Sequence, residues 1–282
     1  MFQKDLLKEK TILITGGGTG LGKSMALRFA ELGANIAITS RREDVLKTAA
    51  AEIEKKGAKV FWKTSDIRKY DEIDAVAEAA WNHFGGIDIL INNAAGNFIS
   101  PTELLSPNAF NSIVSIVLNG SFHTTQAVGR RWINHQRGGR VLSIVTPYAW
   151  TGSAYVVPSA CAKAGVLAMT RSLAVEWAKY KIRLNAIAPG PFPTDQAWEN
   201  IVPEGFEEKW KKPIPLGRTG RHEELANLAS FLVSDFADYI NGDCITIDGG
   251  EWICGAGEFN MLTEMTPADW GKMAERFAKS KK

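Results

Sequence analysis

The stretch that decides the fold is Thr11-Ile-Leu-Ile-Thr15-Gly16-Gly-Gly-Thr-Gly20-Leu-Gly22. Its first five residues are apolar and largely β-branched, which favours a short buried strand. Apolar residues then recur at helical spacing until Gly33. Glycines between a strand and a helix let the backbone approach the phosphates of a nucleotide, whose charge the helix N-terminus meets. The sequence therefore predicts a nucleotide site here.

The next strand, Asn35-Ile-Ala-Ile-Thr39-Ser40, ends in two cations, Arg41 and Arg42. An acid at such a strand end would bind the 2′-hydroxyl of a nucleotide ribose, whereas cations suit a 2′-phosphate. The pair therefore favours NADP(H) as the cofactor. The alternative is two solvated arginines at a helix start, where the helix dipole disfavours them.

Strands and helices then alternate along the chain, which predicts an α/β fold in a single domain. We expect a Rossmann-type, doubly wound, mostly seven-stranded parallel sheet with helices on both faces. The nucleotide-binding half should span about 9–146 and the catalytic and substrate half about 147–282, with a possible lid at 192–213. Helices are expected at 43–56, 70–84, 106–136, 221–232 and 263–279, and further strands at 59–64, 87–91, 139–145, 183–188 and 244–248.

The overall composition excludes several classes of function. The 282 residues are 45% hydrophobic with a net charge of +2, so nucleic acid or a membrane surface is not expected as the main partner. No apolar run approaches the length of a membrane span. Cys161, Cys244 and Cys254 lack metal-ligand spacing and are expected to be reduced, passive thiols, and no metal is expected. Elimination of targeting signals favours a cytoplasmic protein.

The segment from Ser143 to Gly165 is the candidate catalytic region, because it places Lys163 close to several hydroxyl groups. A lysine beside hydroxyls is suited to positioning and polarising an oxygen. The residue one helical turn before Lys163 is Ser159, and two tyrosines, Tyr148 and Tyr155, lie upstream. Which tyrosine acts, if either does, decides the reaction.

The motif Thr15-Gly-x-x-x-Gly20-x-Gly22, with Asn92-Asn-Ala-Ala-Gly96, resembles the short-chain dehydrogenase/reductase superfamily. Most members carry a tyrosine four residues before the lysine and a serine thirteen before that tyrosine; here those positions hold Ser159 and Thr146. The resemblance implies that Asn119 organises a water near Lys163. The implied cofactor contacts are Gly16, Gly18, Thr19, Gly20, Leu21, Gly22, Arg41, Arg42, Asp66, Ile67, Asn93, Ala94, Lys163, Pro189, Gly190 and Pro191. Asp66 could instead cap the helix that follows it.

One branch of the superfamily that departs from the usual tyrosine and serine positions is the mitochondrial-type 2,4-dienoyl-CoA reductases. The chain resembles this branch over nearly its whole length. The most specific similarity is Val156-Val-Pro-Ser159-Ala-Cys-Ala-Lys163-Ala-Gly165. The resemblance implies that Tyr148, fifteen residues before Lys163, and Asn97 donate hydrogen bonds to the thioester carbonyl oxygen. Lys163, assisted by Ser159, would hold the nicotinamide ribose. Tyr155 is expected to be structural, and Tyr148 could alternatively be an aromatic residue at the edge of the core.

The implied function is NADPH-dependent reduction of 2,4-dienoyl-CoA thioesters to enoyl-CoA in the β-oxidation of unsaturated fatty acids. Arg68, Phe98 and Ser106 match acyl- or CoA-contacting positions, although the 192–213 segment lacks the arginine that related enzymes direct at CoA. A homo-oligomer, most simply a tetramer, is implied by resemblance alone. The alternatives are a 2-enoyl-CoA or carbonyl reductase and a non-catalytic NADP-binding scaffold or sensor.

Overall fold

The fold is built on one seven-stranded sheet whose paired strands all run parallel, in the order β3-β2-β1-β4-β5-β6-β7. The computed structural model describes residues 3–194 and 207–280. The parallel sheet confirms the fold class predicted from the sequence. The strands are β1 (Thr11–Thr15), β2 (Asn35–Ser40), β3 (Val60–Thr64), β4 (Ile89–Asn92), β5 (Gly139–Ile144), β6 (Ile182–Pro189) and β7 (Cys244–Ile247).

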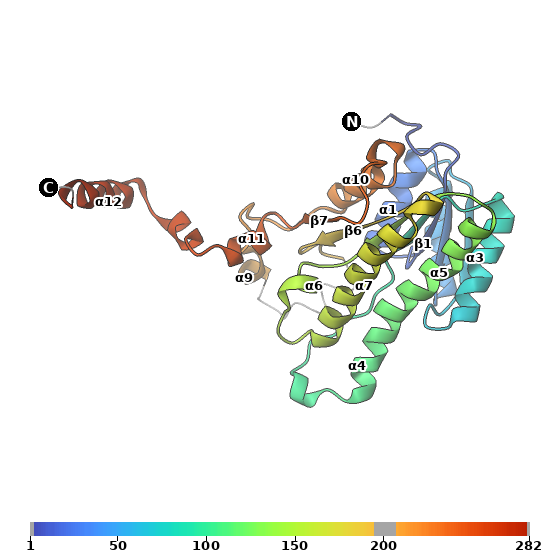
Figure 1. Cartoon of the computed structure of the whole chain (residues 1–282), viewed down its shortest axis with the longest axis horizontal. Helices are drawn as coiled ribbons and strands as arrows, with labels where there is room; N and C mark the ends of the chain where they lie inside the picture. The colour runs from blue at the N-terminus through green and yellow to red at the C-terminus, as the bar shows by residue number, and fades with distance from the viewer. Residues whose placement is uncertain (1–2, 195–206, 281–282) are drawn as a thin grey trace.

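Helices cover both faces of this sheet, as Figure 1 shows. The long ones are α1 (Gly20–Glu31), α2 (Glu43–Glu54), α3 (Tyr70–Phe84), α4 (Pro107–Val114), α5 (Gly120–Asn134), α7 (Val157–Glu176) and α10 (His222–Leu232). The shorter helices include η1 (Thr102–Leu104), α6 (Tyr148–Thr151), η3 (Ala178–Tyr180), α9 (Glu207–Lys211) and η4 (Asp235–Ala237).

The alternation of side chains along β1 shows how the two faces are filled. Ile12 and Ile14 lie in a cluster with α1, α2 and α10, whereas Leu13 lies in a second cluster with α3, α5 and α7. All three side chains are fully buried. Because successive residues of a strand point to opposite faces, a strand covered on both sides reads as a continuous apolar run.

The strand order positions the site. The chain moves outward from β1 to β2 and β3, then crosses back so that β4 pairs with β1 on its other side. At such a reversal the loops after β1 and β4 diverge, and they leave a crevice at the carboxyl ends of the strands. The glycine turn after β1 and the asparagines after β4 therefore meet at one place.

The predicted long helix at 106–136 is helical but not uniform. It consists of α4, a π-helical turn η2 (Ser115–Asn119) and α5. Asn119, which the sequence had singled out, is the last residue of the π turn. Such turns often occur at functional sites because they rotate the side chains that follow them.

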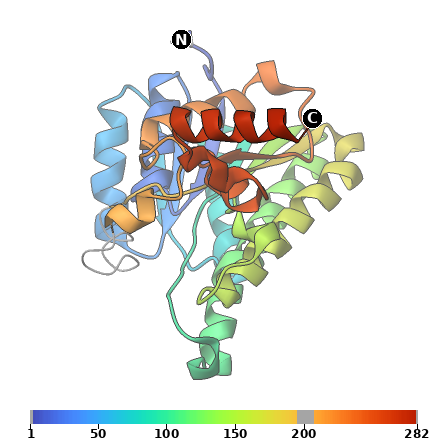
Figure 2. The ribbon, with the colours of Figure 1, turned by 90° about the vertical axis from the view of Figure 1, so that its left-hand side faces the viewer.

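The chain ends in a segment that leaves the body beyond β7 (Figure 1), and in the view of Figure 2 this segment lies in front of the body. It contains α11 (Glu251–Ala256), η5 (Asn260–Glu264) and α12 (Pro267–Lys279). The predicted terminal helix is thus present but begins four residues later than expected. No helix in the described part of the chain is long and apolar enough to cross a membrane.

Candidate active site

The turn after β1 is shaped by glycines. Gly16 and Gly20 have φ angles of +66° and +51°, a region that side chains with a Cβ rarely adopt. A Cβ on Gly22 would lie 2.3 Å from the carbonyl oxygen of Gly16. The turn therefore requires glycine at these positions, and it brings backbone amides to the start of α1.

Thr15 connects this turn to the loop after β4. Its hydroxyl donates to the carbonyl of Ile91 at 3.3 Å and accepts from the backbone amides of Asn93 and Ala94, each at 3.1 Å. The Asn93 amide group donates in turn to the carbonyls of Thr15 and Gly16, at 3.1 and 3.2 Å. Sequence reasoning had used Thr15 only as part of the glycine motif, yet its hydroxyl is the centre of this network.

The residues in this crevice fit a dinucleotide. The N-cap residue of α1, Thr19, makes no side-chain cap, and the first turn of the helix carries no acid. The backbone amides in the first turn of α1 are therefore able to donate hydrogen bonds to a pyrophosphate. The exposed Arg41 and Arg42 follow β2 directly.

The predicted contact segment Pro189-Gly190-Pro191 lies at the end of β6, on the far side of the crevice. Gly190 donates to the carbonyl of Ile247 at 3.0 Å, and a Cβ on Gly190 would lie 2.7 Å from the Asp248 side chain. The backbone of this segment is thus held close against the end of β7.

Asp66, an implied cofactor contact, is paired with Arg68, which matches an acyl- or CoA-contacting position. The Arg68 Nε donates to both Asp66 carboxylate oxygens at 2.9 Å, and the Arg68 amide donates to Oδ1 at 3.0 Å. The Arg68 guanidinium holds the pKa of Asp66 below its usual value. Ile67 between them is buried beside Gly120 of α5. The Asp66 carboxylate therefore orders the turn before α3.

Lys163 is buried in α7 and donates from Nζ to the carbonyl oxygen of Ile144 at the end of β5. No acid lies against it among the described residues, and burial lowers its pKa to about 8. A lysine in this state retains donor capacity toward a ligand while losing part of its charge near neutral pH.

Tyr148, not Tyr155, lies beside this lysine helix. The Tyr148 hydroxyl is 3.0 Å from the Ser159 hydroxyl, and Ser159 is buried one turn before Lys163. The hydroxyl of Thr146 is buried nearby with no partner in the described part of the chain. An unpaired buried hydroxyl costs free energy, so a bound molecule that hydrogen-bonds to it is favoured.

Tyr155 has a different role. Its side chain is 58% exposed, and its backbone adopts a left-handed φ of +66°. Its carbonyl accepts from the amide of Ser100 at 3.0 Å. Tyr155 therefore joins the loop before α7 to the loop after β4 through its backbone.

Asn97 lies on that same loop and is exposed. Its side-chain oxygen accepts from the Phe98 amide at 3.0 Å, which leaves the NH₂ group to donate elsewhere. Phe98 and Ala149, the neighbours of Asn97 and Tyr148, pack against one apolar cluster. The two proposed donors thus flank the same cluster.

Other predicted residues show roles in the fold itself. The Ser106 hydroxyl caps α4 by accepting from the Ala109 amide at 3.1 Å. Asn119 is exposed at the end of the π turn. Most of the predicted lid, residues 195–206, lies outside the described residues.

His222, to which the sequence assigned no role, holds the segment after β6. Its ring nitrogens lie 2.8 Å from the Ser24 hydroxyl and 2.6 Å from the Pro193 carbonyl. It thereby connects α10 and α1 to the residues that follow Pro191. A lone histidine at a helix start gives no sequence signal for this contact.

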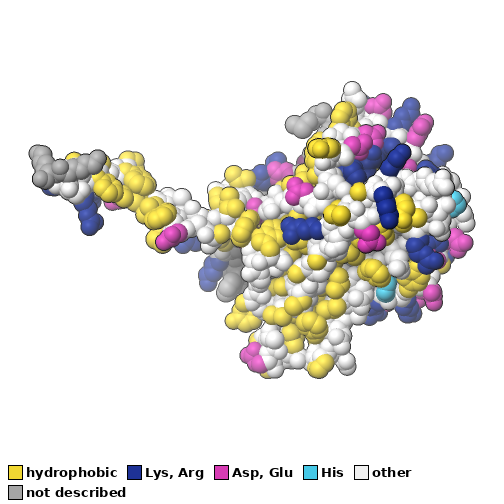
Figure 3. Space-filling model, viewed as in Figure 1, with side chains coloured by type: hydrophobic (Ala, Val, Ile, Leu, Met, Phe, Trp, Pro, Cys, Tyr) yellow, Lys and Arg dark blue, Asp and Glu magenta, His cyan; other side chains and the backbone are white. Residues whose placement is uncertain are grey.

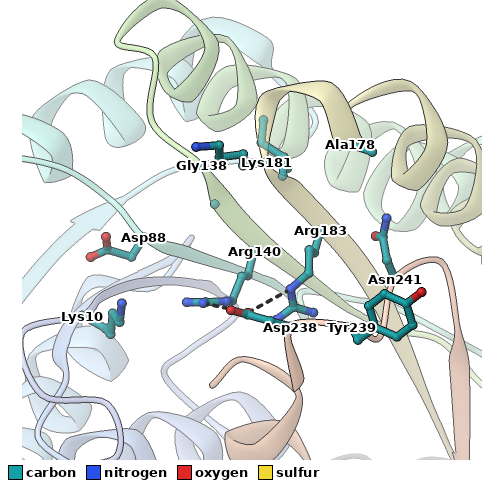
Figure 4. A pocket seen from close by; sticks show the side chains of 12 residues that line it. Lys10, Asp88, Gly138, Arg140, Ala178, Lys181, Arg183, Asp238, Tyr239 and Asn241 are labelled. Atoms are coloured by element: carbon teal, nitrogen blue, oxygen red, sulfur yellow. Dashed lines mark hydrogen bonds and ion pairs between the residues drawn. The ribbon is translucent and has the colours of Figure 1, made fainter. Parts of the chain in front are cut away.

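A cavity of about 590 Å³ lies at the other end of the sheet, beside the amino ends of the strands (Figure 4). The guanidinium groups of Arg140 and Arg183 converge on Asp238, at 3.0 and 3.4 Å. These ion pairs tie the segment before β7 to β5 and β6. This cavity therefore lies at the end of the strands away from the candidate active site.

Comparison with known proteins identifies the family of this chain. The model of a family described as "Enoyl-(Acyl carrier protein) reductase" matches residues 16–251. The chain is 46% identical over 249 residues to a Bacillus subtilis protein named "Probable 2,4-dienoyl-CoA reductase [(2E)-enoyl-CoA-producing]", covering 88% of this chain and 98% of that protein. It is 37% identical to "Peroxisomal 2,4-dienoyl-CoA reductase [(3E)-enoyl-CoA-producing]" of Arabidopsis thaliana, covering 89% and 87%.

A solved structure supports the same grouping. A short chain dehydrogenase from Bacillus anthracis superposes with a TM-score of 0.80 at 48% identity, covering 87% of this chain and 97% of that one.

Proposed function

This chain belongs to the short-chain dehydrogenase/reductase family of oxidoreductases, and from that premise we propose that it reduces 2,4-dienoyl-CoA thioesters with NADPH. The observation that carries the proposal is the contact between Tyr148 and Ser159. It places a phenol against Ser159, one helical turn before Lys163, although the usual tyrosine position holds that serine. Relatives named as 2,4-dienoyl-CoA reductases support the reaction type.

The cofactor would be held by the chain's own groups. The glycine turn and the first amides of α1 bind the pyrophosphate, and Arg41 and Arg42 bind the ribose 2′-phosphate. Lys163 and Ser159 hold the nicotinamide ribose, and the Pro189–Pro191 backbone contacts the nicotinamide amide. When bound, the dinucleotide contributes a hydride.

Tyr148 and Asn97 act on the substrate. As the conjugated thioester is reduced, negative charge gathers on its carbonyl oxygen. The Tyr148 phenol and the Asn97 amide donate hydrogen bonds to that oxygen and stabilise the dienolate. The carbon skeleton then takes a proton from water, so the chain needs no acidic phenol next to Lys163.

The floor of the site combines apolar packing with fixed hydrogen-bond donors. The lysine helix, the end of β5 and the cluster beneath Phe98 and Ala149 keep the floor of the site apolar. In such surroundings fixed hydrogen-bond donors interact more strongly with developing charge than they would in water. The unpaired hydroxyl of Thr146 adds a further polar group at this floor.

The test is NADPH oxidation with 2,4-hexadienoyl-CoA as substrate. Saturable turnover, with NADH less effective, supports the proposal. The absence of turnover at millimolar thioester would contradict it. A second candidate, reduction of 2-enoyl thioesters, is favoured by the description of the matching family model. Turnover of crotonyl-CoA while the dienoyl substrate stays inert would select that reaction.

A further inference from the structure

The segment after β6, residues 190–194, is held by the residues that precede α10. The Gly220 amide donates to the carbonyl of Pro191 at 2.9 Å. A Cβ on Gly220 would lie 2.3 Å from the Phe192 ring, so this ring packs directly against the glycine. Backbone and packing thereby fix the first half of the segment to the start of α10.

The second half of the segment depends on His222, the first residue of α10. Its Nε2 lies 2.6 Å from the Pro193 carbonyl oxygen. Because a carbonyl can only accept, Nε2 carries a proton and donates it. No other donor among the described residues reaches this oxygen. The next residue, Thr194, lies over the glycine turn, where its methyl carbon is 3.1 Å from the position that a Cβ on Gly20 would take. His222 therefore holds the segment at the point where it reaches the turn after β1.

The other ring nitrogen connects the same histidine to α1. Nδ1 lies 2.8 Å from the Ser24 hydroxyl, which is also 3.0 Å from the Gly20 carbonyl oxygen. When Nδ1 is unprotonated, the hydroxyl donates to it. When Nδ1 is protonated, the hydroxyl accepts from it and donates to Gly20 instead. Nε2 donates to Pro193 in both cases, so the bond to the segment after β6 persists in both protonation states of the ring.

The other three histidines of the chain are engaged differently, since each lies beside an aromatic ring. The pairs are His83 with Phe84, His123 with Tyr70, and His135 with Trp81. The histidine side chains that Figure 3 shows (cyan) lie over α3 and α5. These contacts belong to the packing of the two helices, whereas His222 joins two segments of the candidate active site.

A segment that is already fixed favours the binding of a ligand that contacts it. A loop without its tether loses conformational freedom when a ligand orders it, and this loss weakens binding. The backbone at the start of the segment is the part proposed above to contact the nicotinamide amide. Fixing the segment should therefore favour binding of the nicotinamide end of the cofactor, with little effect on the adenine end.

We propose that His222 is a positioning residue for the nicotinamide end of the cofactor, acting through its hydrogen bond to the Pro193 carbonyl. The inference rests on the cofactor part of the proposed function, namely the contact between the Pro189–Pro191 backbone and the nicotinamide. It uses no feature of the dienoyl substrate, so it holds equally for a chain that reduces another thioester.

The experiment compares His222→Asn with His222→Gln in the full chain. The amide nitrogen of glutamine is able to take the place of Nε2 and donate to Pro193, whereas that of the shorter asparagine corresponds to Nδ1 and does not reach the carbonyl. Fluorescence titration gives the Kd for NADPH. Competition then gives the Kd for 2′-phospho-ADP-ribose, which has the pyrophosphate but lacks the nicotinamide.

His222→Asn should raise the Kd for NADPH by roughly three- to tenfold, the effect of losing one hydrogen bond, and leave the Kd for 2′-phospho-ADP-ribose unchanged. His222→Gln should stay within about twofold of the wild type for both ligands. His135→Asn removes an exposed histidine after α5 and should match the wild type. The same titrations with NADH and ADP-ribose make the test independent of the 2′-phosphate.

Two results would overturn the proposal. Equal weakening of both ligands by His222→Asn, or equal effects of asparagine and glutamine, would show that the side chain only supports the start of α10. A wild type that binds the fragment as tightly as the whole cofactor would leave the nicotinamide end without a contribution for His222 to position. Failure to reduce 2,4-hexadienoyl-CoA, with the expected binding results intact, would contradict the proposed reaction alone.

Discussion

The hydroxyls of Tyr148 and Ser159 lie 3.0 Å apart and join α6 to α7 one helical turn before Lys163. The contact makes a specific prediction for Ser159. Ser159→Ala should lower kcat modestly, by roughly three- to thirtyfold, because Tyr148 loses its positioning partner. In the Tyr148→Phe background, Ser159→Ala should cost a smaller factor than it costs in the wild type, because residues in contact are coupled and only the ribose contact of Ser159 remains to be lost. Fully multiplicative losses in a kinetic double-mutant cycle would show that the two hydroxyls act independently.

Lys163 should make the unliganded protein less stable than a neutral variant. Burial lowers its pKa from 10.5 to about 8, a cost of about 3 kcal/mol while the lysine is charged. That cost is fully present below pH 8. It disappears as the pH rises toward 10.5, the pKa of the lysine in the unfolded chain, because in this range the unfolded chain keeps a proton that the folded protein has lost. Lys163→Met should therefore raise Tm at pH 7 while abolishing turnover.

Thermal unfolding of the two apo proteins between pH 7 and pH 10.5 checks the direction of this pH dependence. The stability advantage of Lys163→Met should shrink across the window. An advantage that grows with pH, or a variant less stable than the wild type at pH 7, would contradict the account of a desolvated lysine.

The features that could be predicted from the sequence are those set by residues close together in the chain. The sheet follows from local patterns, because buried parallel strands such as β1 read as apolar runs between turn signals. Counting back from Lys163 showed that Ser159 holds the usual tyrosine position, and the resemblance to the dienoyl-CoA reductases then singled out Tyr148. Its partner Ser159 required the turn of the chain between α6 and α7, which no periodicity encodes.

The contacts that were hardest to predict are those of polar side chains able to bind either a ligand or a neighbouring group of the chain. Asp66 and Arg68 each suggested a ligand contact, but two residues of separation allow them to pair with each other. Ser106, which matches an acyl- or CoA-contacting position, also caps α4, a role that its place before Pro107 could have indicated. The π turn ending at Asn119 likewise has no signature in a helix of ordinary composition.

The cofactor preference should depend on the two arginines after β2. Arg41→Ala/Arg42→Ala should lower kcat/KM for NADPH by roughly ten- to a hundredfold, because charge-assisted hydrogen bonds to the 2′-phosphate are lost. The value for NADH should change little. Lys47→Ala removes an exposed cation from α2 and serves as the control. Equal losses with both cofactors would indicate a structural role for the arginines.

The glycine turn should tolerate no added methyl group at Gly22. Gly22→Ala places a Cβ 2.3 Å from the Gly16 carbonyl oxygen and 2.5 Å from the Asn93 side chain. We expect weaker NADPH binding by fluorescence titration and a lower Tm. Gly271→Ala in α12 has open space around it and should be neutral or slightly stabilising. Unaltered binding by Gly22→Ala would mean that this turn does not form the pyrophosphate site.

The central claim is that Tyr148, and not Tyr155, donates to the thioester oxygen. The most direct measurement is the rate of NADPH oxidation with 2,4-hexadienoyl-CoA for the wild type, Tyr148→Phe and Tyr155→Phe. Tyr148→Phe should lower kcat by roughly ten- to a thousandfold through the loss of one oxyanion donor. Tyr155→Phe should stay within about twofold of the wild type, because its side chain is exposed and its structural contact is made by the backbone. Equal activities of the two variants would contradict the assignment.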